Sequence, residues 1–263
     1  MVLHQQYVYS FIKMKNHDMI DINLSFQLSM FGSYQDIAPS SNTLQYLIEK
    51  FNDKELIPTT FQEIDIANPL TPINRFSMRS TNEVWSIVFN ANRIDIIKNN
   101  NDVGVVKMGN VHDFIEEAIN IVRIIDEKFP KKHYRLALIT RYLLKQMSPS
   151  EISSTFRKNV NTYGFFNTHE PIEWNNRVVA RTEQNIGELT ETINVIAESN
   201  RIKGQLKVNS KNEDIDRVEL KFDINTYQLQ TDYRFGISEL DTFAYAAHKI
   251  ETQIKNDYTT LIC

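Results

Sequence analysis

The stretch Val218 to Asn225 reads VELKFDIN, in which apolar and polar residues alternate strictly. A repeat of two is typical of a strand with one face in the core and the other in water. After Ser238 the apolar residues instead recur every three or four positions, which predicts a helix with one buried stripe. Together the two patterns predict a helix lying across an antiparallel sheet. The stripe consists of Leu240, Phe243, Ala244, Ala247, Ile250, Ile254, Tyr258 and Leu261.

The same two patterns occur earlier in the chain. Ile20 to Met30 alternates as clearly as the stretch above and predicts a strand, with Gln6 to Met14 as its partner across a polar turn. A second long amphipathic helix is predicted from Val111 to Phe129, where Pro130 ends it. A further strand is predicted from Leu136 to Met147.

These elements predict an α+β fold in which amphipathic helices cover antiparallel sheets. Helices do not separate the strands one by one, which argues against a doubly wound parallel sheet. Hairpin strands followed by one long helix occur in residues 1–147 and again in 148–263. We therefore expect two similar halves, which either share a continuous sheet or pack face to face.

The less regular stretches are predicted as loops and short elements. Phe61 to Ile66 predicts a brief strand, and the prolines after it predict an irregular loop as far as Pro72. Ser148 to Glu151 has the pattern of a cap on a short helical turn. Asn209 to Asp214 contains no apolar residue and predicts an exposed loop.

Composition excludes several classes of protein. The formal net charge of the 263 residues is −4, which argues against broad electrostatic binding to nucleic acid. Seven glycines, none in a phosphate-loop spacing, give no sign of a nucleotide cofactor. The single cysteine, Cys263, cannot form an internal disulfide, and no stretch reaches the roughly 20 apolar residues of a membrane span. We expect a cytoplasmic protein with no cofactor and no membrane contact.

Two short motifs resemble those of a known family. Arg135 to Tyr142 reads RLALITRY after the central helix, and Leu220 to Tyr227 reads LKFDINTY before the last one. The chain resembles a sporadically distributed bacterial and archaeal family of similar length with no assigned activity, although Ala137 and Ile139 depart from the usual pattern. The resemblance carries over no catalytic residue. It implies an accessory role in a mobile-element or defence system.

One set of residues is compatible with metal-dependent nuclease or hydrolase chemistry. Glu219, Lys221 and Asp223 share one face of a predicted strand, downstream of Asp214 and Asp216. In such enzymes carboxylates hold a divalent cation while a lysine polarises the attacking water. The solvated face of an ordinary strand explains the same residues equally well.

A second set is compatible with an anionic partner such as nucleic acid. Its members gather around one predicted helix-to-strand connection, although lysines that follow a helix also complement the helix dipole. The set consists of Lys131, Lys132, Arg135, Arg141 and Lys145.

No other arrangement indicates catalysis or metal binding. The six histidines are scattered without metal-ligand spacing, so we expect no metal site. The stretch His169 to Trp174 has weak periodicity and predicts a loop that packs Trp174 against the core. The leading hypothesis is a non-enzymatic factor that binds another protein. The alternatives are a metal-dependent nuclease or hydrolase and a nucleic-acid-binding module.

Overall fold

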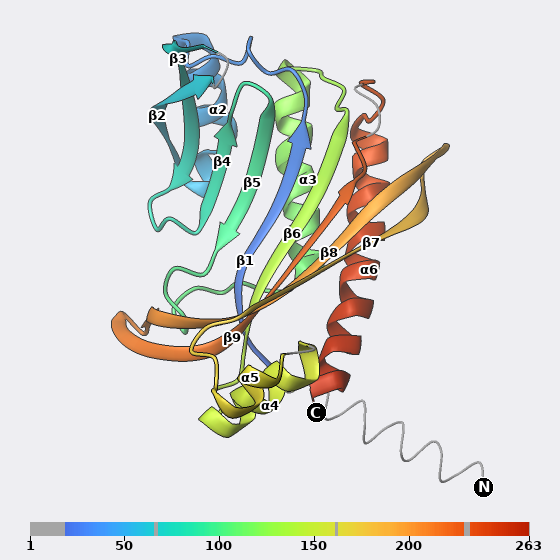
Figure 1. Cartoon of the computed structure of the whole chain (residues 1–263). Helices are drawn as coiled ribbons and strands as arrows, with labels where there is room; N and C mark the ends of the chain where they lie inside the picture. The colour runs from blue at the N-terminus through green and yellow to red at the C-terminus, as the bar shows by residue number, and fades with distance from the viewer. Residues whose placement is uncertain (1–18, 66–67, 161–162, 229–231, 263) are drawn as a thin grey trace, which may run out of the picture.

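A computed structural model describes residues 19–65, 68–160, 163–228 and 232–262. The fold is α+β, with nine antiparallel strands in one sheet of order β2-β3-β4-β5-β1-β6-β9-β8-β7 (Figure 1). The strands are β1 (Ile20–Phe31), β2 (Leu56–Asp65), β3 (Asn68–Ser80), β4 (Trp85–Phe89), β5 (Arg93–Asn99), β6 (Arg135–Leu144), β7 (Asn175–Ile186), β8 (Leu189–Val208) and β9 (Lys211–Thr226). The helices are α2 (Ser41–Lys50), η1 (Asn52–Lys54), α3 (Val111–Lys128), α4 (Pro149–Asn159), α5 (Gly164–Thr168) and α6 (Ile237–Ile262).

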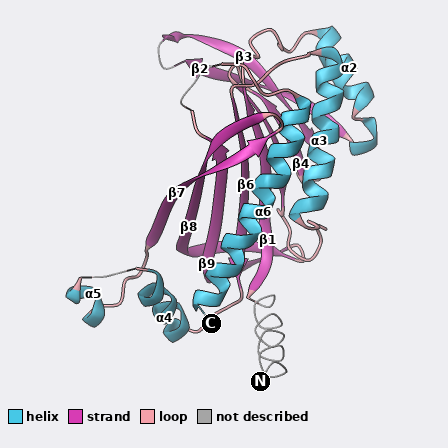
Figure 2. Cartoon of the chain, turned by 90° about the vertical axis from the view of Figure 1, so that its right-hand side faces the viewer, coloured by secondary structure: helices cyan, strands magenta, loops and turns pink. Residues whose placement is uncertain are grey.

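The two long helices lie side by side on one face of the sheet (Figures 1 and 2). Helix α3 packs near β1, and α6 lies across β6, β9 and β7. Helix α2 lies beside β2, whereas α4 lies near the C-terminal end of α6 and α5 lies beyond α4 (Figure 2). We call the face opposite the long helices the open face. No helix in the described part of the chain is both long enough and apolar enough to cross a membrane.

The core lies between the sheet and these helices, as the alternation predicts. In β9 the apolar residues Val218 to Ile224 are at most 1% exposed, and they face the α6 stripe that begins at Leu240. In β1 the even-numbered residues Phe26 to Met30 are buried in the same layer. The prediction of helices covering an antiparallel sheet is confirmed.

One sheet joins the two halves predicted from the sequence. Strand β6 belongs to residues 1–147 and β9 to residues 148–263, and they pair directly with Thr140 opposite Phe222. The halves therefore share a continuous sheet. The expected similarity of the two halves stays a prediction.

One predicted loop is part of a long hairpin. Strands β2 and β3 pair from Leu56 opposite Ser80 to Asp65 opposite Asn68, so the expected irregular loop before Pro72 is wrong. The prolines are tolerated because β2 is an edge strand and β4 pairs with β3 only from Phe76 onward. A proline that lacks an N–H costs no ladder hydrogen bond at a free edge.

The predicted loop from Asn209 to Asp214 is also wrong in extent. Only Asn209 and Ser210 form the turn, both with a left-handed backbone, and β9 begins at Lys211. Two-residue turns with two positive φ angles match the twist of a hairpin. Likewise the predicted helical turn after Ser148 is the eleven-residue helix α4. The predicted strand Gln6 to Met14 lies outside the described residues.

Candidate functional site

The three residues of the nuclease hypothesis lie on the open face of β9, and each has a polar partner. Glu219 accepts a hydrogen bond from Arg141 Nε at 2.6 Å. Lys221 Nζ lies 3.5 Å from a carboxylate oxygen of Glu198. Asp223 accepts a hydrogen bond from the side-chain amide of Asn225, at 2.8 Å. The three side chains share a face as predicted, but a basic group already neutralises Glu219.

The predicted basic set is spread along β6. Lys131 and Lys132 precede the strand, and the Lys131 ammonium lies 2.7 Å from Asp36. Arg135 begins the strand and stacks on Phe31, with 4.8 Å between the guanidinium carbon and the ring centroid. Strand geometry separates Arg135 from Arg141 by about 20 Å, so the structure does not gather these residues into one patch.

The described histidines, carboxylates and thiols form no group of three that could hold a metal ion. His133 is buried, and its Nδ1 lies 2.6 Å from the Tyr34 hydroxyl. Burial lowers the pKa of His133 to about 4, so the imidazole is neutral at pH 7. It therefore acts as a neutral hydrogen-bonding group in the core.

A buried carboxylate ties α6 to the sheet. Glu251 is fully buried and accepts a hydrogen bond from the Tyr142 hydroxyl at 2.6 Å, with Lys255 Nζ at 3.2 Å and His248 Nδ1 at 3.4 Å. Burial raises the pKa of Glu251, but these three neighbours outweigh that effect and lower it overall. The carboxylate is thus ionised and paired, which suits a structural role.

The connection between β6 and β7 carries an unusual number of exposed apolar side chains. Tyr163 is 83% exposed, Phe165 62% and Ile172 78%, and Phe166 is also exposed. We call these four residues the aromatic segment. The Phe165 ring stacks on His169, with 4.2 Å between centroids, and lies edge-on to Phe166. Contiguous exposed apolar surface of this kind is typical of interaction sites.

The flanks of the aromatic segment are firmly anchored. Helix α4 begins with a capping box in which the Ser148 side chain accepts from the Glu151 N–H and Glu151 accepts from the Ser148 N–H. Its buried Phe156 packs against Trp174, whose side chain is 7% exposed, as the sequence predicts. Helix α4 and Trp174 are therefore held in place on the two sides of the aromatic segment.

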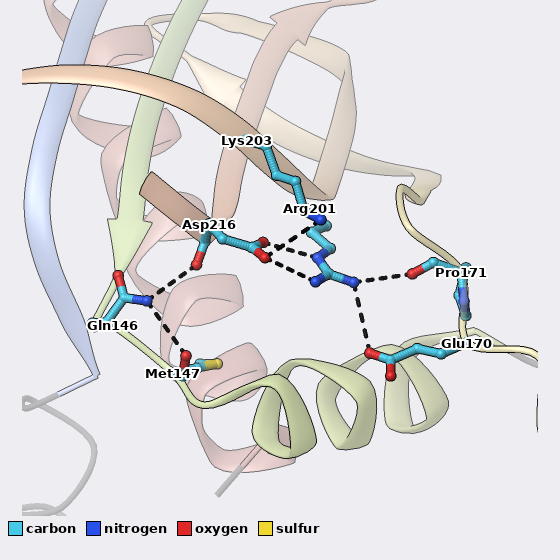
Figure 3. A network of polar contacts seen from close by, with 7 residues as sticks. All are labelled: Gln146, Met147, Glu170, Pro171, Arg201, Lys203 and Asp216. Carbon is cyan, nitrogen blue, oxygen red and sulfur yellow. Dashed lines mark hydrogen bonds and ion pairs between the residues drawn. The ribbon is translucent and has the colours of Figure 1, made fainter. Parts of the chain in front are cut away.

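Arg201 of β8 provides the second anchor (Figure 3). Its guanidinium makes a bidentate pair with Asp216 at 2.8 and 2.9 Å and donates to the Pro171 carbonyl at 3.0 Å. The Arg201 backbone N–H donates to the Trp174 carbonyl at 3.1 Å. Because Arg201 and Asp216 lie on β8 and β9, this network holds the residues after α5 against the hairpin that these strands form.

An apolar groove of about 470 Å³ lies between α6, the end of α4 and strands β7, β8 and β9. Its floor is formed by Phe222 and Ala197 and one wall by Ile254, Tyr258 and Leu261 of α6. Asn159, which ends α4, and Asn176 of β7 also line it. The chain between these two asparagines contains the whole aromatic segment. Residues that line the groove therefore flank the segment in the sequence, and we take the two surfaces together as the candidate functional site.

Two buried hydroxyl groups in the groove form no hydrogen bond of ordinary geometry in the described part of the chain. They are Ser199 Oγ and the Tyr258 hydroxyl, and the Ser199 side chain is only 2% exposed. Burial raises the pKa of Tyr258 to about 12, although the nearby polar groups of Ser199 and Asn159 oppose part of that rise. Buried hydroxyl groups normally have a partner, and leaving one unsatisfied costs about 1–3 kcal/mol.

Sequence reasoning singled out part of this region but missed its character. The stretch from His169 to Trp174 was expected to be a presented loop, and the preceding Tyr163, Phe165 and Phe166 carry the stronger signal. These aromatic residues follow neither the repeat of a strand nor that of a buried helix. No family model, no curated protein and no solved structure matches this chain.

Proposed function

We propose that this chain is a non-enzymatic factor that binds another protein through the aromatic segment and the apolar groove. The observation that carries the proposal is the exposure of Tyr163, Phe165 and Ile172 in a segment whose flanking residues line an apolar groove. Burying such a side chain in an interface contributes about 1.5–3 kcal/mol. Aromatic residues are enriched at the centres of protein interfaces.

The surroundings support a protein partner over a small molecule. None of the four residues of the aromatic segment lines the groove, so a ligand confined to the groove would leave Phe165 and Ile172 in water. The rim carries both signs of charge, with Lys158, Asp257 and Glu198. An apolar centre with a mixed polar rim is the usual anatomy of a protein interface. The accessory role implied by the family resemblance would make the partner a component of a mobile-element or defence system.

The test is site-specific photo-crosslinking of the full chain in its native host. A photoreactive phenylalanine analogue at position 165 is expected to give one discrete adduct with another protein. The same analogue at position 245 is the matched control, because Tyr245 is also an exposed aromatic residue but lies on α6, outside the aromatic segment. With the photoreactive analogue at position 172, the substitution Phe165→Asp is expected to reduce the yield of the adduct about tenfold.

Three outcomes would overturn the proposal. The first is equal labelling from positions 165 and 245, which would show that the aromatic segment contacts other proteins no more than the control surface on α6 does. The second is an adduct only with a second copy of this chain, which would make the segment a self-association surface. The third is the absence of any protein adduct from positions 165 and 172. Thermal unfolding of each variant establishes that a lost adduct does not reflect a lost fold.

A further inference from the structure

A polar cleft of about 610 Å³ lies where four stretches far apart in the sequence meet. They are η1, the turn between β3 and β4, the end of β5 with the loop after it, and the tip of the β8–β9 hairpin. We call it the lysine cleft because Lys54, Lys98, Lys107 and Lys207 line it. Its volume falls in the range of small-molecule sites, about 300–1,000 Å³.

The hairpin tip is fixed in place as one wall of the cleft. Asp102 accepts hydrogen bonds from the Ser210 backbone N–H at 2.9 Å and from its hydroxyl at 3.1 Å. Gly104 has a φ of +87°, and a Cβ built there would lie 2.4 Å from the Asn209 side-chain oxygen. Only glycine allows this close approach without strain. The wall that carries Lys207 is therefore preformed.

The two carboxylates of the lining do not make the cleft acidic. Asp102 is 7% exposed and lies 3.3 Å from Lys207 Nζ, so its charge is already balanced. The backbone N–H of Ser210 is the main cause that keeps the pKa of Asp102 below its ordinary value. The Asp53 side chain is 72% exposed and hence well hydrated.

Two of the four lysines lack a carboxylate partner. Lys54 forms an ion pair with Glu117, and Lys207 with Asp102. Within the described residues, neither Lys98 nor Lys107 has a carboxylate at ion-pair distance. Lys98 Nζ donates to the Met108 carbonyl at 2.8 Å. Burial lowers the pKa of Lys98, and Glu117 and Asp113 compensate only in part. An additional negative charge in the cleft would stabilise the charged form of Lys98.

The aromatic residue of the cleft is not free to stack on a ligand. The Trp85 ring stacks on Phe114 with 5.8 Å between centroids, and Lys98 Nζ lies 5.2 Å over it. The indole is therefore already in contact with an aromatic ring and a cation. A ligand here would be recognised by its charge and size, because there is no platform for a nucleobase.

We propose that the lysine cleft binds a compact phosphate-bearing anion, with Lys98 and Lys107 as its principal cations. Lysine binds phosphate as a point charge, and the partial burial of Lys98 limits how much water screens its charge. The cleft is separate from the aromatic segment and from the predicted basic set, so this site is independent of the proposed protein-binding function.

The test is isothermal titration of the full chain with inorganic pyrophosphate at low and at high ionic strength. We expect saturable binding that salt weakens, and about a tenfold loss of affinity in Lys107→Gln. Lys107 is exposed, so this variant is expected to fold normally. Lys98→Met is expected to weaken binding at least as much, with unfolding by denaturant measured in parallel.

Lys132→Gln is the matched control, because Lys132 is exposed and belongs to the predicted basic set rather than to the cleft. It is expected to change the affinity less than twofold. A titration without saturable heat would overturn the proposal, as would an equal loss in Lys132→Gln and Lys107→Gln. A titration with ATP provides the third arm, and binding of ATP without binding of pyrophosphate would contradict recognition by charge alone.

Discussion

The apolar groove and the lysine cleft differ in what each leaves unsatisfied. In the groove, the hydroxyl groups of Ser199 and Tyr258 form no hydrogen bond of ordinary geometry, while most of the lining is apolar. In the cleft the polar groups of the β3–β4 turn are hydrogen-bonded, whereas Lys98 and Lys107 have no carboxylate partner among the described residues. The comparison shows how one fold can present two surfaces that suit different classes of ligand.

One hairpin connects the two regions. Arg201 and Asp216 lie near the middle of its ladder, which we call its base, and they hold the chain beside the aromatic segment. Its tip at Lys207 and Ser210 forms a wall of the cleft. Each end can be perturbed by a single substitution. If the regions work independently, a change at the base should leave anion binding intact and a change at the tip should leave protein binding intact.

The largest effect is expected at the base of the hairpin. Arg201→Met removes a largely buried cation, leaves the Pro171 carbonyl without its donor and leaves Asp216 with only Lys203 Nζ, at 3.6 Å. We expect the free energy of unfolding to fall by about 3 kcal/mol, the low end for such a pair because Asp216 is partly exposed. The adduct from position 165 should weaken, whereas pyrophosphate affinity should change less than twofold.

The same variant should alter the response to acid. Hydrogen bonding from Arg201 is the main cause that lowers the pKa of Asp216 below its ordinary value of 3.8. A lowered carboxyl pKa stabilises the fold above the ordinary value, and this stability is lost as the pH falls through the folded-state value. The stability gap between wild type and Arg201→Met should therefore narrow in acid. Arg177→Met is the control, because that exposed ion pair contributes well under about 1 kcal/mol.

A smaller effect is expected at the tip. Gly104→Val places a β-branched side chain at a φ of +87° and against Asn209, a strain of about 2 kcal/mol that undocking the tip would relieve. We expect pyrophosphate affinity to fall several-fold while the adduct from position 165 persists. Gly204→Val is the matched control in the same hairpin, since a Cβ at that glycine meets nothing within 4 Å. Equal losses of pyrophosphate affinity in the two variants would show that anion binding does not depend on the docked position of the hairpin tip.

The sequence predicts the fold where one face of an element is buried and the other is wet. The apolar stripe of Val111 to Phe129 and the alternation of Ile20 to Met30 both correspond to observed elements with nearly the same bounds. Prediction fails where that contrast is missing. Lys211 to Asp214 extends beyond the helix-covered part of the sheet and is exposed on both faces, so it shows no alternation despite being a strand.

The candidate sites are harder to predict, because both are assembled from distant segments. Lys54, Lys98 and Lys207 are separated by 44 and 109 positions, and no pattern in the sequence connects them. The predicted basic set is close in sequence, yet the extended geometry of β6 disperses it. The aromatic segment is the exception, since Tyr163, Phe165 and Phe166 are apolar residues without a repeat and could have been singled out from the sequence.

The smallest effect tests the contrast between the two regions directly, by removing one hydroxyl from each. Ser80 lies in the cleft lining, where its hydroxyl donates to Asn82 at 2.7 Å and accepts from the Trp85 N–H at 2.9 Å. Ser80→Ala is therefore expected to lower the free energy of unfolding by about 1 kcal/mol. Ser199→Ala removes a buried hydroxyl that forms no hydrogen bond of ordinary geometry, so it is expected to leave that free energy unchanged or raise it by up to about 1 kcal/mol.

Denaturant titration of both variants measures this difference in sign. Binding of the protein partner should rank the two variants in the opposite order. A partner that hydrogen-bonds to Ser199 would bind Ser199→Ala more weakly than wild type, whereas it should bind Ser80→Ala as it binds wild type. If Ser199→Ala is destabilised as much as Ser80→Ala, the Ser199 hydroxyl already has a partner in the free protein. The groove would then have no unmet hydrogen-bonding need, and apolar contact alone would have to account for its affinity.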